Sequence, residues 1–327
     1  MLPPGPLRLP LALPVIAAPL FIVSGPGLVI AQCCAGVIGS FPALNARPKD
    51  TLDAWIVRIK AETAAFAAAH PGAVVAPFAV NQIAHASNDR LDHDVEVCVR
   101  HEVPIVITSL RVPRRVVDAV HAYGGVVLHD VINMRHAAKA LDDGVDGLIA
   151  VCAGAGGHAG TLSPFAFVRE LRAAFDGPIA LSGSIADGAS ILAARALGAD
   201  FAYIGTRFIA SAEANADPDY KQMLIDHAAS DVVYSSLFTG VHGNYLRPSI
   251  ARAGLDPNAL PEADESTMNF GSAALGEAKA WRDIWGSGQG IGGIADAPPV
   301  ARIVERMRAE YDAARARLAD EATAAAV

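Results

Sequence analysis

Short apolar runs alternate with longer segments of helical period along most of the chain. The runs are rich in Val, Ile and Ala, and most are apolar at every position, which is typical of strands covered on both faces. We expect eight strands, at residues 14–18, 36–40, 74–80, 104–108, 125–129, 147–151, 178–182 and 200–205.

Helical periodicity is clearest over residues 51–69. Asp50 comes directly before this segment and is expected to be its N-cap. Four apolar side chains are expected near one face of the helix: Leu52, Trp55, Ile59 and Phe66.

Two further segments carry both a start and a stop signal for a helix. Asn133 is expected to cap a helix over 134–143 that Gly144 ends, and Asp187 to cap a helix that Gly198 ends. A strand follows each glycine, and repeated β-α units with short loops indicate a parallel sheet. Eight such units over roughly 200 residues predict an α/β fold, a closed (β/α)8 TIM barrel rather than an open sheet.

Residues 211–297 break this rhythm. A helical segment, 217–230, is followed by many Gly, Pro and Asn residues, and a last helix is expected at 299–318. We therefore predict a barrel formed by residues 1–210 and 298–327, with a loop-rich and helical insertion between the eighth strand and the last helix. Loops of this length are uncommon unless they serve a site, so the insertion is expected to cover the active-site face. It could also form the contact of a homodimer.

Composition narrows the class of protein. The 327 residues are 52% hydrophobic and 18% charged, which excludes a disordered chain, and the net charge of −8 argues against nucleic acid as a partner. Several Pro and Gly residues break the most apolar stretch, 9–31, so no membrane span is expected there. The four cysteines lack the spacing of a zinc or thioredoxin site, which favours buried thiols in a reducing, cytoplasmic setting.

The loop after the sixth strand is the first candidate for chemistry. It reads Ala-Gly-Ala-Gly-Gly-His-Ala-Gly over 153–160, and barrel enzymes place their sites at the C-terminal ends of the strands. Glycines such as Gly156 and Gly157 allow a ligand to approach the backbone. His158 titrates near neutral pH and can act as an acid or a base. The alternative is a glycine-rich loop with an incidental histidine.

The loops after the seventh and eighth strands predict a phosphate site. They supply small residues and hydroxyl groups, and barrels commonly bind phosphate at these two loops. The residues concerned are Ser182, Gly183, Ser184, Gly205 and Thr206. Two ordinary helix caps are the alternative. Neither the G-x-G-x-x-G dinucleotide fingerprint nor the G-x-S-x-G nucleophile elbow is present.

Other strand ends are less informative. Ala18, Pro19 and Leu20 follow the first strand and suit either a flat apolar ring or the core, and Asn81 could contact a heterocycle or serve as a cap. Arg111, with the nearby Arg114 and Arg115, is expected on the solvated face of a helix. No metal site is expected, because the ten histidines are scattered and no H-E-x-x-H motif occurs.

Taken together, these segments resemble the nitronate monooxygenase family, formerly called 2-nitropropane dioxygenases, over roughly residues 14–318. The most specific parts are AGAGGHAG (153–160), LSGSIADG (181–188), ALGADFAYIGTRF (196–208), TGVHGNYLRPS (239–249) and SGQGIG (287–292). The resemblance implies an FMN-binding TIM barrel with an extra segment.

The resemblance also implies residue roles. Ala18, Pro19 and Leu20 would line the flavin ring, and Asn81 would touch its polar edge. His158 would be the active-site histidine. The remaining contacts to FMN would come from Gly156, Gly157, Ser182, Gly183, Ser184, Gly205, Thr206 and Gln289.

Two positions depart from the pattern of the family. Its phosphate loop often reads Ser-Gly-Gly, whereas Ser184 stands last here and can still offer its N–H group. Some flavin-dependent relatives carry a lysine after the fifth strand, where this chain has His129 and Asp130. No permanent cation is therefore supplied at that point, which leaves the choice of substrate open.

The resemblance implies oxidation of alkyl nitronates by O2 to a carbonyl compound and nitrite, with a small-molecule nitronate as substrate. The same barrel also serves flavin-dependent NAD(P)H oxidoreductases such as quinone reductases and enoyl-acyl-carrier-protein reductases, and these are the alternative. The non-enzymatic hypothesis is a barrel that binds a phosphate-bearing ligand and catalyses no reaction.

Overall fold

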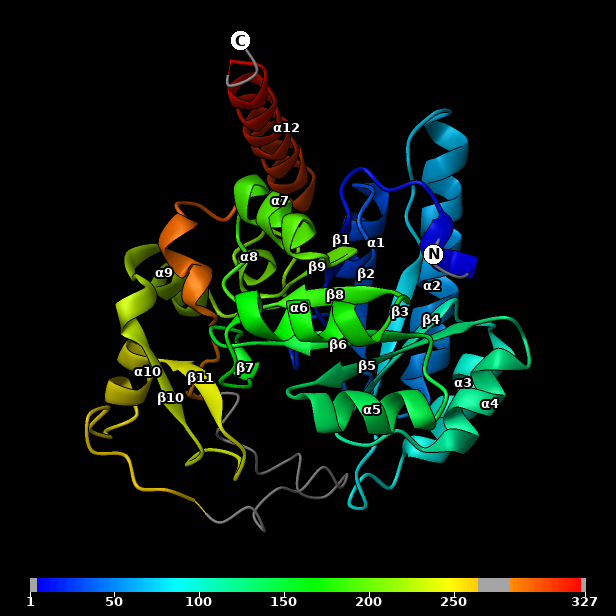
Figure 1. Cartoon of the computed structure of the whole chain (residues 1–327). Helices are drawn as coiled ribbons and strands as arrows, with labels where there is room; N and C mark the ends of the chain where they lie inside the picture. The colour runs from blue at the N-terminus through cyan, green and yellow to red at the C-terminus, as the bar shows by residue number, and fades with distance from the viewer. Residues whose placement is uncertain (1–4, 264–282, 325–327) are drawn as a thin grey trace.

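The computed structural model describes residues 5–263 and 283–324. Eight parallel strands form one sheet in the order β1-β9-β8-β6-β5-β4-β3-β2, and a bridge between Ile16 and Ile38 joins its two ends (Figure 1). The strands are β1 (Val15–Ala17), β2 (Gly39–Pro42), β3 (Phe78–Ile83), β4 (Ile105–Ser109), β5 (Val126–Val131), β6 (Gly147–Val151), β8 (Ile179–Ser182) and β9 (Phe201–Ile204). The predicted (β/α)8 barrel is confirmed.

Helices surround the ring of strands. They are α1 (Pro26–Cys34), α2 (Thr51–Ala69), α3 (Leu91–Arg100), α4 (Arg114–His121), α5 (Met134–Asp142), α6 (Pro164–Ala174), α7 (Gly188–Leu197) and α12 (Val300–Ala324). The caps of α5 and α7 are confirmed. Asn133 accepts from the backbone N–H of His136 at 2.8 Å, Asp187 accepts from that of Ser190 at 2.7 Å, and Gly198 ends α7 with a φ of 107°.

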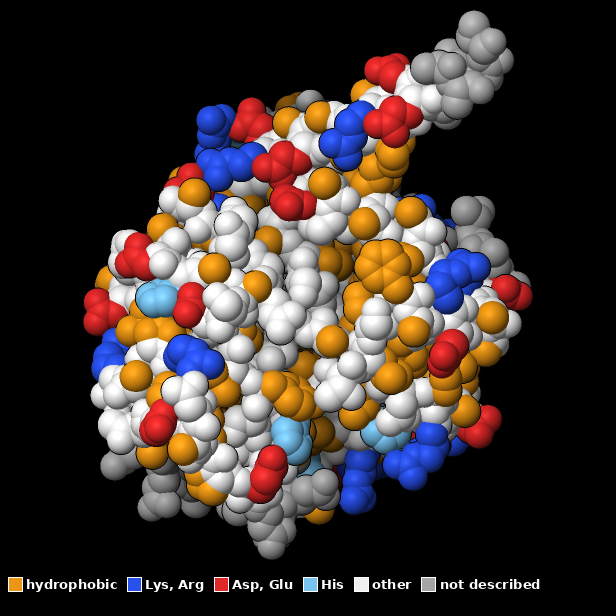
Figure 2. All heavy atoms as spheres, turned by 60° about the vertical axis from the view of Figure 1, so that its left-hand side comes forward, with side chains coloured by type: hydrophobic (Ala, Val, Ile, Leu, Met, Phe, Trp, Pro, Cys, Tyr) orange, Lys and Arg blue, Asp and Glu red, His pale blue; other side chains and the backbone are white. Residues whose placement is uncertain are grey.

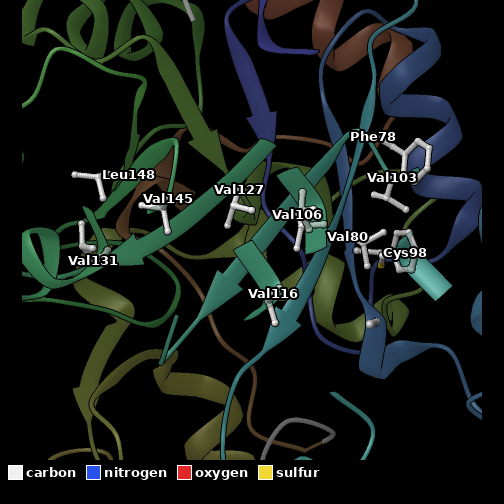
Figure 3. Packing of buried hydrophobic residues seen from close by; sticks show 14 of the residues in the cluster. Phe78, Val80, Cys98, Val103, Val106, Val116, Val127, Val131, Val145 and Leu148 are labelled. Carbon is white, nitrogen blue, oxygen red and sulfur yellow. The ribbon is translucent and has the colours of Figure 1, made fainter. Parts of the chain in front are cut away.

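The alternation of side chains along each strand divides the core into two layers. Val80, Val106 and Val127 point outward and pack under the helices, as Figure 3 shows for the outer cluster. Their strand neighbours belong to a separate cluster that fills the barrel: Ala79, Ile105, Ile107, Val126, Leu128, Ile149, Ala180, Phe201 and Tyr203. Both faces of the sheet are therefore buried, which explains the continuous apolar runs.

The segment between β9 and α12 contains more regular structure than expected. β10 (Val232–Ser235) and β11 (Gly243–Leu246) pair in antiparallel fashion, and β11 also pairs with β7 (Gly157–His158). This three-stranded sheet was not predicted, because its strands are short and β7 lies in a glycine loop. It lies beside the barrel together with α9 (Pro218–Asp226) and α10 (Arg247–Arg252) (Figure 1).

Several predicted boundaries are wrong. Strands two and three begin at Gly39 and Phe78, later than expected, and the turn at Gly36 (φ 83°) and the missing N–H of Pro77 delay the ladder. The helix expected at 217–230 ends at Asp226, and the last helix extends to Ala324.

Of two expectations about α2, the cap fails, and the apolar face holds for Leu52, Trp55 and Ile59 but not for Phe66. Asp50 makes no side-chain capping bond, because its own backbone is already helical (φ −65°, ψ −14°). Leu52, Ile56 and Ile59 are the buried residues of α2, whereas Phe66 stacks on His70 at the end of the helix with ring centroids 4.2 Å apart.

The last helix is fixed to the barrel by its first turns. Val300, Ile303, Val304 and Met307 are buried, and beyond them α12 projects from the body of the molecule, with acidic and basic side chains on its surface (Figure 2). The buried guanidinium of Arg207, in α8 (Thr206–Ile209), lies 3.1 Å from a carboxylate oxygen of Asp296. Arg306 of α12 binds the same carboxylate at 2.7 Å, so Asp296 links the eighth βα loop to the last helix.

No helix in the described ranges is long and apolar enough to cross a membrane. The four cysteines form no disulfide, and burial raises the pKa of the Cys33, Cys98 and Cys152 thiols to about 12. These thiols are therefore neutral.

Candidate active site

A cavity of about 1310 Å³ opens at the C-terminal ends of the barrel strands. Twelve of the predicted site residues line it, from five different βα loops and strand ends: Ala18, Pro19, Leu20, Asn81, Gly156, Gly157, His158, Ser182, Gly183, Ser184, Gly205 and Thr206. The structure therefore brings together residues that lie up to 188 positions apart (206 − 18).

Gln289 is the predicted site residue that the structure does not bring to the cavity wall. Its neighbours Gly288 and Gly290 line the cavity, whereas the Gln289 side chain is exposed. Its backbone N–H donates to the carbonyl oxygen of Gly154 at 2.9 Å. Gln289 thus holds its own loop, which belongs to η6 (Gln289–Gly293), against the loop after β6.

His158 is positioned by the inserted segment. Nε2 of the imidazole lies 2.8 Å from Oγ1 of Thr239, and that hydroxyl lies 3.0 Å from the carbonyl oxygen of Val241. Because a carbonyl can only accept, we assign the threonine proton to Val241, and on this assignment Nε2 of His158 donates to Thr239. Nδ1 is then the basic nitrogen of the ring.

The charge of His158 follows from its surroundings. Burial lowers the pKa of the imidazole to about 4, because the charged form loses solvation in the cavity wall. The ring is therefore neutral at neutral pH, which suits a base or a neutral hydrogen-bond donor rather than a fixed cation. Pairing of β7 with β11 through Gly243 opposite His158 fixes the backbone of the histidine.

Close backbone contacts join the loops around the site. A Cβ added to Gly156 would lie 2.7 Å from the amide nitrogen of Gly288 and 3.0 Å from the carbonyl carbon of Ser287. Gly288 also donates its N–H to Oγ1 of Thr206 at 2.9 Å. The loops after β6 and β9 and the turn before α12 therefore form one packed wall, which only glycine at position 156 permits.

The loop after β8 differs from expectation in one respect. Gly183 has a φ of 140°, and Ser184 has a φ of 55°, in the left-handed region that disfavours residues with a side chain. The N–H of Ser184 was expected to be available to a phosphate, but it donates to the carbonyl oxygen of Gly154 at 3.2 Å. Ser184 can therefore offer its hydroxyl to a phosphate rather than its backbone N–H.

The floor of the cavity carries polar side chains where the barrel interior meets the loops. Asn81, Ser109 and Asp130 follow Ala79, Ile107 and Leu128 by two positions, so they occupy inward-facing positions. Nδ2 of Asn81 donates to Oγ of Ser109 at 2.8 Å, and Ser109 donates to Oδ2 of Asp130 at 2.6 Å. Ser109 was missed by sequence reasoning, and Asp130 was noted only as a departure from the family.

Aromatic residues of the inserted segment close one side. Tyr220 and Trp285 line the cavity and stack with ring centroids 4.8 Å apart. Arg252 covers the outer face of Trp285 at 3.9 Å from the ring centroid. These residues and Thr239 were not predicted as site residues, although Thr239 opens the segment TGVHGNYLRPS, one of those that carry the resemblance to the family.

The cavity wall carries charged side chains of both signs. Arg111, Arg135 and Lys139 line it together with Asp143 and Asp217, and none of the three cations forms an ion pair within the described parts of the chain. The prediction that Arg111 lies on a helix face is wrong, because α4 begins only at Arg114. The three cations can bind anionic groups of a ligand, although the net charge of the chain is −8. No group of three potential metal ligands is found in residues 5–263 or 283–324.

A closed barrel with a large cavity at its strand ends and a histidine in the wall has the architecture of a (β/α)8-barrel enzyme. The sequence profile of the nitronate monooxygenase family matches residues 9–310. The chain therefore belongs to the nitronate monooxygenase family of flavin-dependent oxidoreductases.

Individual relatives differ in function. The chain is 30% identical over 197 residues to a nitronate monooxygenase of Paraburkholderia phytofirmans, which covers 56% of this chain and 54% of that protein. It is 25% identical over 240 residues to a (3aS,4S,5R,7aS)-5-hydroxy-7a-methyl-1-oxo-octahydro-1H-indene-4-carboxyl-CoA dehydrogenase of Rhodococcus jostii. The match covers 73% of this chain and 64% of that protein. The chain thus spans between half and two thirds of the length of these curated relatives.

Solved structures agree with the fold. Nitroalkane oxidase from Streptomyces ansochromogenes is similar with a TM-score of 0.78 and 26% identity, over 93% of this chain and 97% of that one. FabK from Thermotoga maritima shares the fold with a TM-score of 0.75 and 24% identity, over 95% and 96% of the two chains.

Proposed function

We propose that the protein is an FMN-dependent nitronate monooxygenase that converts alkyl nitronates and O2 to a carbonyl compound and nitrite. The observation that carries the proposal is the neutral imidazole of His158, held by Thr239 in the same cavity as the loops after β8 and β9. Membership of the family and the similarity to nitronate and nitroalkane enzymes support it.

The residues of the cavity fit FMN. The volume of about 1310 Å³ exceeds the 300–1,000 Å³ of ordinary ligand pockets, so it leaves room for a small substrate beside a flavin. Gly183, the Ser184 hydroxyl, Gly205 and Thr206 would hold the phosphate. When bound, FMN supplies the electron-transfer chemistry, and the protein orients and tunes it.

The apolar and polar parts of the cavity wall would contact different parts of the flavin ring. Ala18, Pro19 and Leu20 provide a wall without charge for the flat ring, and Asn81 provides an amide on the floor. Residues 211–297 would cover the site, because Tyr220, Thr239 and Trp285 all come from this segment, while residues 1–210 and 298–327 form the barrel.

His158 has two tasks in this proposal. Its Nε2–H is committed to Thr239, so the basic Nδ1 would remove the α-proton of a neutral nitroalkane and generate the nitronate. A substrate that is already a nitronate needs no base, and the ring then only positions its nitro group. Replacing His158 by Ala or Asn is expected to keep the bound flavin and remove most turnover of nitroalkanes.

A second function is favoured by one observation. The unpaired cations Arg111, Arg135 and Lys139 in the cavity wall suit the phosphate groups of a pyridine nucleotide or a CoA thioester, which a small nitronate does not carry. A flavin-dependent NAD(P)H oxidoreductase is therefore the alternative. The similarity to a carboxyl-CoA dehydrogenase supports a phosphorylated substrate as well.

An anaerobic experiment separates the two. The flavin-loaded protein is mixed with ethyl nitronate, NADH or NADPH, and the flavin absorbance is followed. Bleaching by the nitronate alone supports the nitronate monooxygenase, and bleaching only by a pyridine nucleotide contradicts it. A colourless protein that takes up no added FMN would contradict both functions and favour a ligand-binding barrel without chemistry.

A further inference from the structure

Asp130 is an acid on the floor of the cavity that the proposed chemistry does not use. It occupies the inward-facing position of β5 that follows Leu128, and it lines the cavity. Its Oδ2 accepts from Oγ of Ser109 at 2.6 Å, and Ser109 in turn accepts from Nδ2 of Asn81 at 2.8 Å. A relay of hydrogen bonds therefore runs from β3 through β4 and ends at this carboxyl group.

The other oxygen of Asp130 has no partner. Oδ1 is excluded from solvent and makes no hydrogen bond within the described chain. A buried polar atom left without a partner costs about 1–3 kcal/mol, and Asp130 is the cavity-lining residue, among those described, that carries such an atom, so the position points to a group that arrives in the cavity. Because Ser109 already satisfies Oδ2, an incoming ligand would pair with Oδ1.

The groups that face Asp130 are neutral. The neighbouring His129 of β5 occupies the opposite, outward-facing position, where its Nδ1 lies 2.9 Å from Oγ1 of Thr108, and burial lowers the pKa of this imidazole to about 4. From β9, burial raises the pKa of Tyr203 well above its usual value, and the charge of Asp130 adds to the effect. Ser109 from β4 and Asn81 from β3 carry no charge.

The charged and titratable side chains elsewhere in the cavity wall form no ion pair with Asp130. They come from the loop before α4, from α5 and its flanks, from β7 and from the start of α9: Arg111, Arg135, His136, Lys139, Asp143, His158 and Asp217. Without a cationic partner, burial raises the pKa of Asp130 to about 6, while the hydrogen bond from Ser109 opposes the rise. The acid is therefore half ionised near pH 6 and mostly ionised at pH 8.

We propose that Asp130 is a cofactor-binding residue that donates a hydrogen bond from Oδ1 to the flavin ring, and that flavin binding weakens when this proton is lost. The inference rests on the proposed function, because it takes the ligand on the floor to be a flavin. A neutral acid can donate to a ring acceptor, whereas the carboxylate would repel the negative charge that a flavin gains on reduction. Asp130 would thus give the ring a titratable donor where a lysine would give a permanent charge.

The test is the pH dependence of flavin binding to the full chain. Dissociation constants of riboflavin and FMN are measured by fluorescence quenching between pH 5 and pH 8. Riboflavin is the decisive probe, since the phosphate of FMN titrates near pH 6 by itself, as phosphate monoesters do. We expect riboflavin to bind about tenfold more weakly at pH 7 than at pH 5, the loss that follows when the pH lies one unit above the pKa of a required acid.

Two substitutions at Asp130 separate the donor from the charge. Asp130→Asn keeps a donor and cannot ionise, so its riboflavin affinity should be independent of pH. Asp130→Leu removes the donor, and its affinity should be about tenfold weaker at every pH, the loss expected for one buried hydrogen bond. Any pH dependence of FMN binding that remains in Asp130→Asn is due to ionisation of the FMN phosphate.

Ser109→Ala provides a second measurement on a positioning residue. Its hydroxyl lowers the pKa of Asp130, so its removal should move the midpoint of riboflavin binding to higher pH. A role confined to structure would not move a midpoint. Ser40→Ala is the matched control, because Ser40 is a buried serine of β2 whose hydroxyl donates to the Ala17 carbonyl, away from Asp130.

The outcomes distinguish this inference from the proposed function. If no flavin binds at any pH, the proposed function is wrong and the inference is overturned with it. If flavin binds but the riboflavin profile of the wild type is flat, or is unchanged in Asp130→Asn and Ser109→Ala, the inference alone is overturned. A profile that flattens in Asp130→Asn and shifts upward in Ser109→Ala supports it.

Discussion

The imidazole of His158 and the hydroxyl of Thr239 lie 2.8 Å apart, although 81 positions separate them in the chain. The contact forms because β11 of the inserted segment pairs with β7, which carries the histidine. The inserted segment therefore supplies part of the site, since the direction of this hydrogen bond decides which nitrogen of His158 is basic.

Replacing Thr239 by Val should lower the turnover of a neutral nitroalkane about tenfold, the effect of losing one hydrogen bond of roughly 1.4 kcal/mol. The ring would lose the acceptor that selects its Nε2–H tautomer. Turnover of a preformed nitronate, which needs no base, should change much less. Steady-state kinetics with both substrates check this, with Thr239→Ser as the control that keeps the hydroxyl. Equal losses for both substrates would contradict the role of Thr239.

The pH profile of nitroalkane turnover should reflect the low pKa of His158. Burial lowers that pKa to about 4, so the base stays unprotonated from pH 8 down to about pH 5. Activity that requires the free base is then lost only as the pH falls through about 4. Measurement of kcat/KM in the wild type, corrected for ionisation of the substrate, checks the position of the acid limb. An acid limb near pH 6.5 would show that the imidazole of His158 is solvated and has the usual pKa of histidine.

Replacing Gly156 by Ala should disrupt the wall of the cavity. The new Cβ would lie 2.7 Å from the amide nitrogen of Gly288, so one of the two loops must move. We expect a loss of about 1–3 kcal/mol in the free energy of unfolding, as in overpacked sites, together with weaker FMN binding. Gly292→Ala is the matched control, because nothing lies within 4 Å of a Cβ there. Equal flavin affinity in both variants would contradict the close approach.

Local signals allowed much of the barrel to be predicted from the sequence. Asn133, Asp187 and Gly198 act through bonds to residues three or four positions away, so their roles can be read from neighbours. The eight apolar runs identified the strands because both faces of the sheet are buried. The starts of β2 and β3 were wrong because apolar residues before a strand look the same as those within it.

The predicted site was incomplete where it depends on long-range geometry. Residues after strand ends, such as Ser182 and Thr206, could be placed in the cavity because parallel strands converge. Thr239 could not, since its approach to His158 depends on an unpredicted antiparallel pairing. The N–H of Ser184 was expected to be available, but Gly154 from another loop accepts it.

Replacing Ser184 by Gly should stabilise the protein. The serine has a φ of 55°, and the left-handed conformation costs a residue with a Cβ about 1–2 kcal/mol. The larger entropy of glycine in the unfolded chain offsets about 0.5–1 kcal/mol, which leaves a gain of up to about 1 kcal/mol. Thermal unfolding checks this. Ser163→Gly is the control, because Ser163 has an ordinary φ of −61° and should gain nothing. A lower melting temperature for Ser184→Gly would show that the hydroxyl outweighs the strain.

Replacing Asp296 by Asn should destabilise the protein and change its acid sensitivity. The hydrogen bond from Arg306 holds the pKa of Asp296 below its usual value, and the charges of Arg306 and Arg207 add to this. A carboxyl whose pKa is lowered by folding contributes stability above its unfolded pKa of about 3.9, and that contribution is lost as the pH falls through the folded pKa. The buried Arg207 would also lose its carboxylate partner. Because the Asp296 side chain is 41% exposed, we expect a loss of only about 1–2 kcal/mol at pH 7.

Denaturant unfolding at pH 7 and pH 3 measures this loss. The difference in the free energy of unfolding between the wild type and Asp296→Asn should be smaller at pH 3. The control is Asp312→Asn, which breaks an exposed pair with Arg315 at 3.5 Å and should change little at either pH. A gap that is the same at both pH values would mean that the charge of Asp296 does not stabilise this junction.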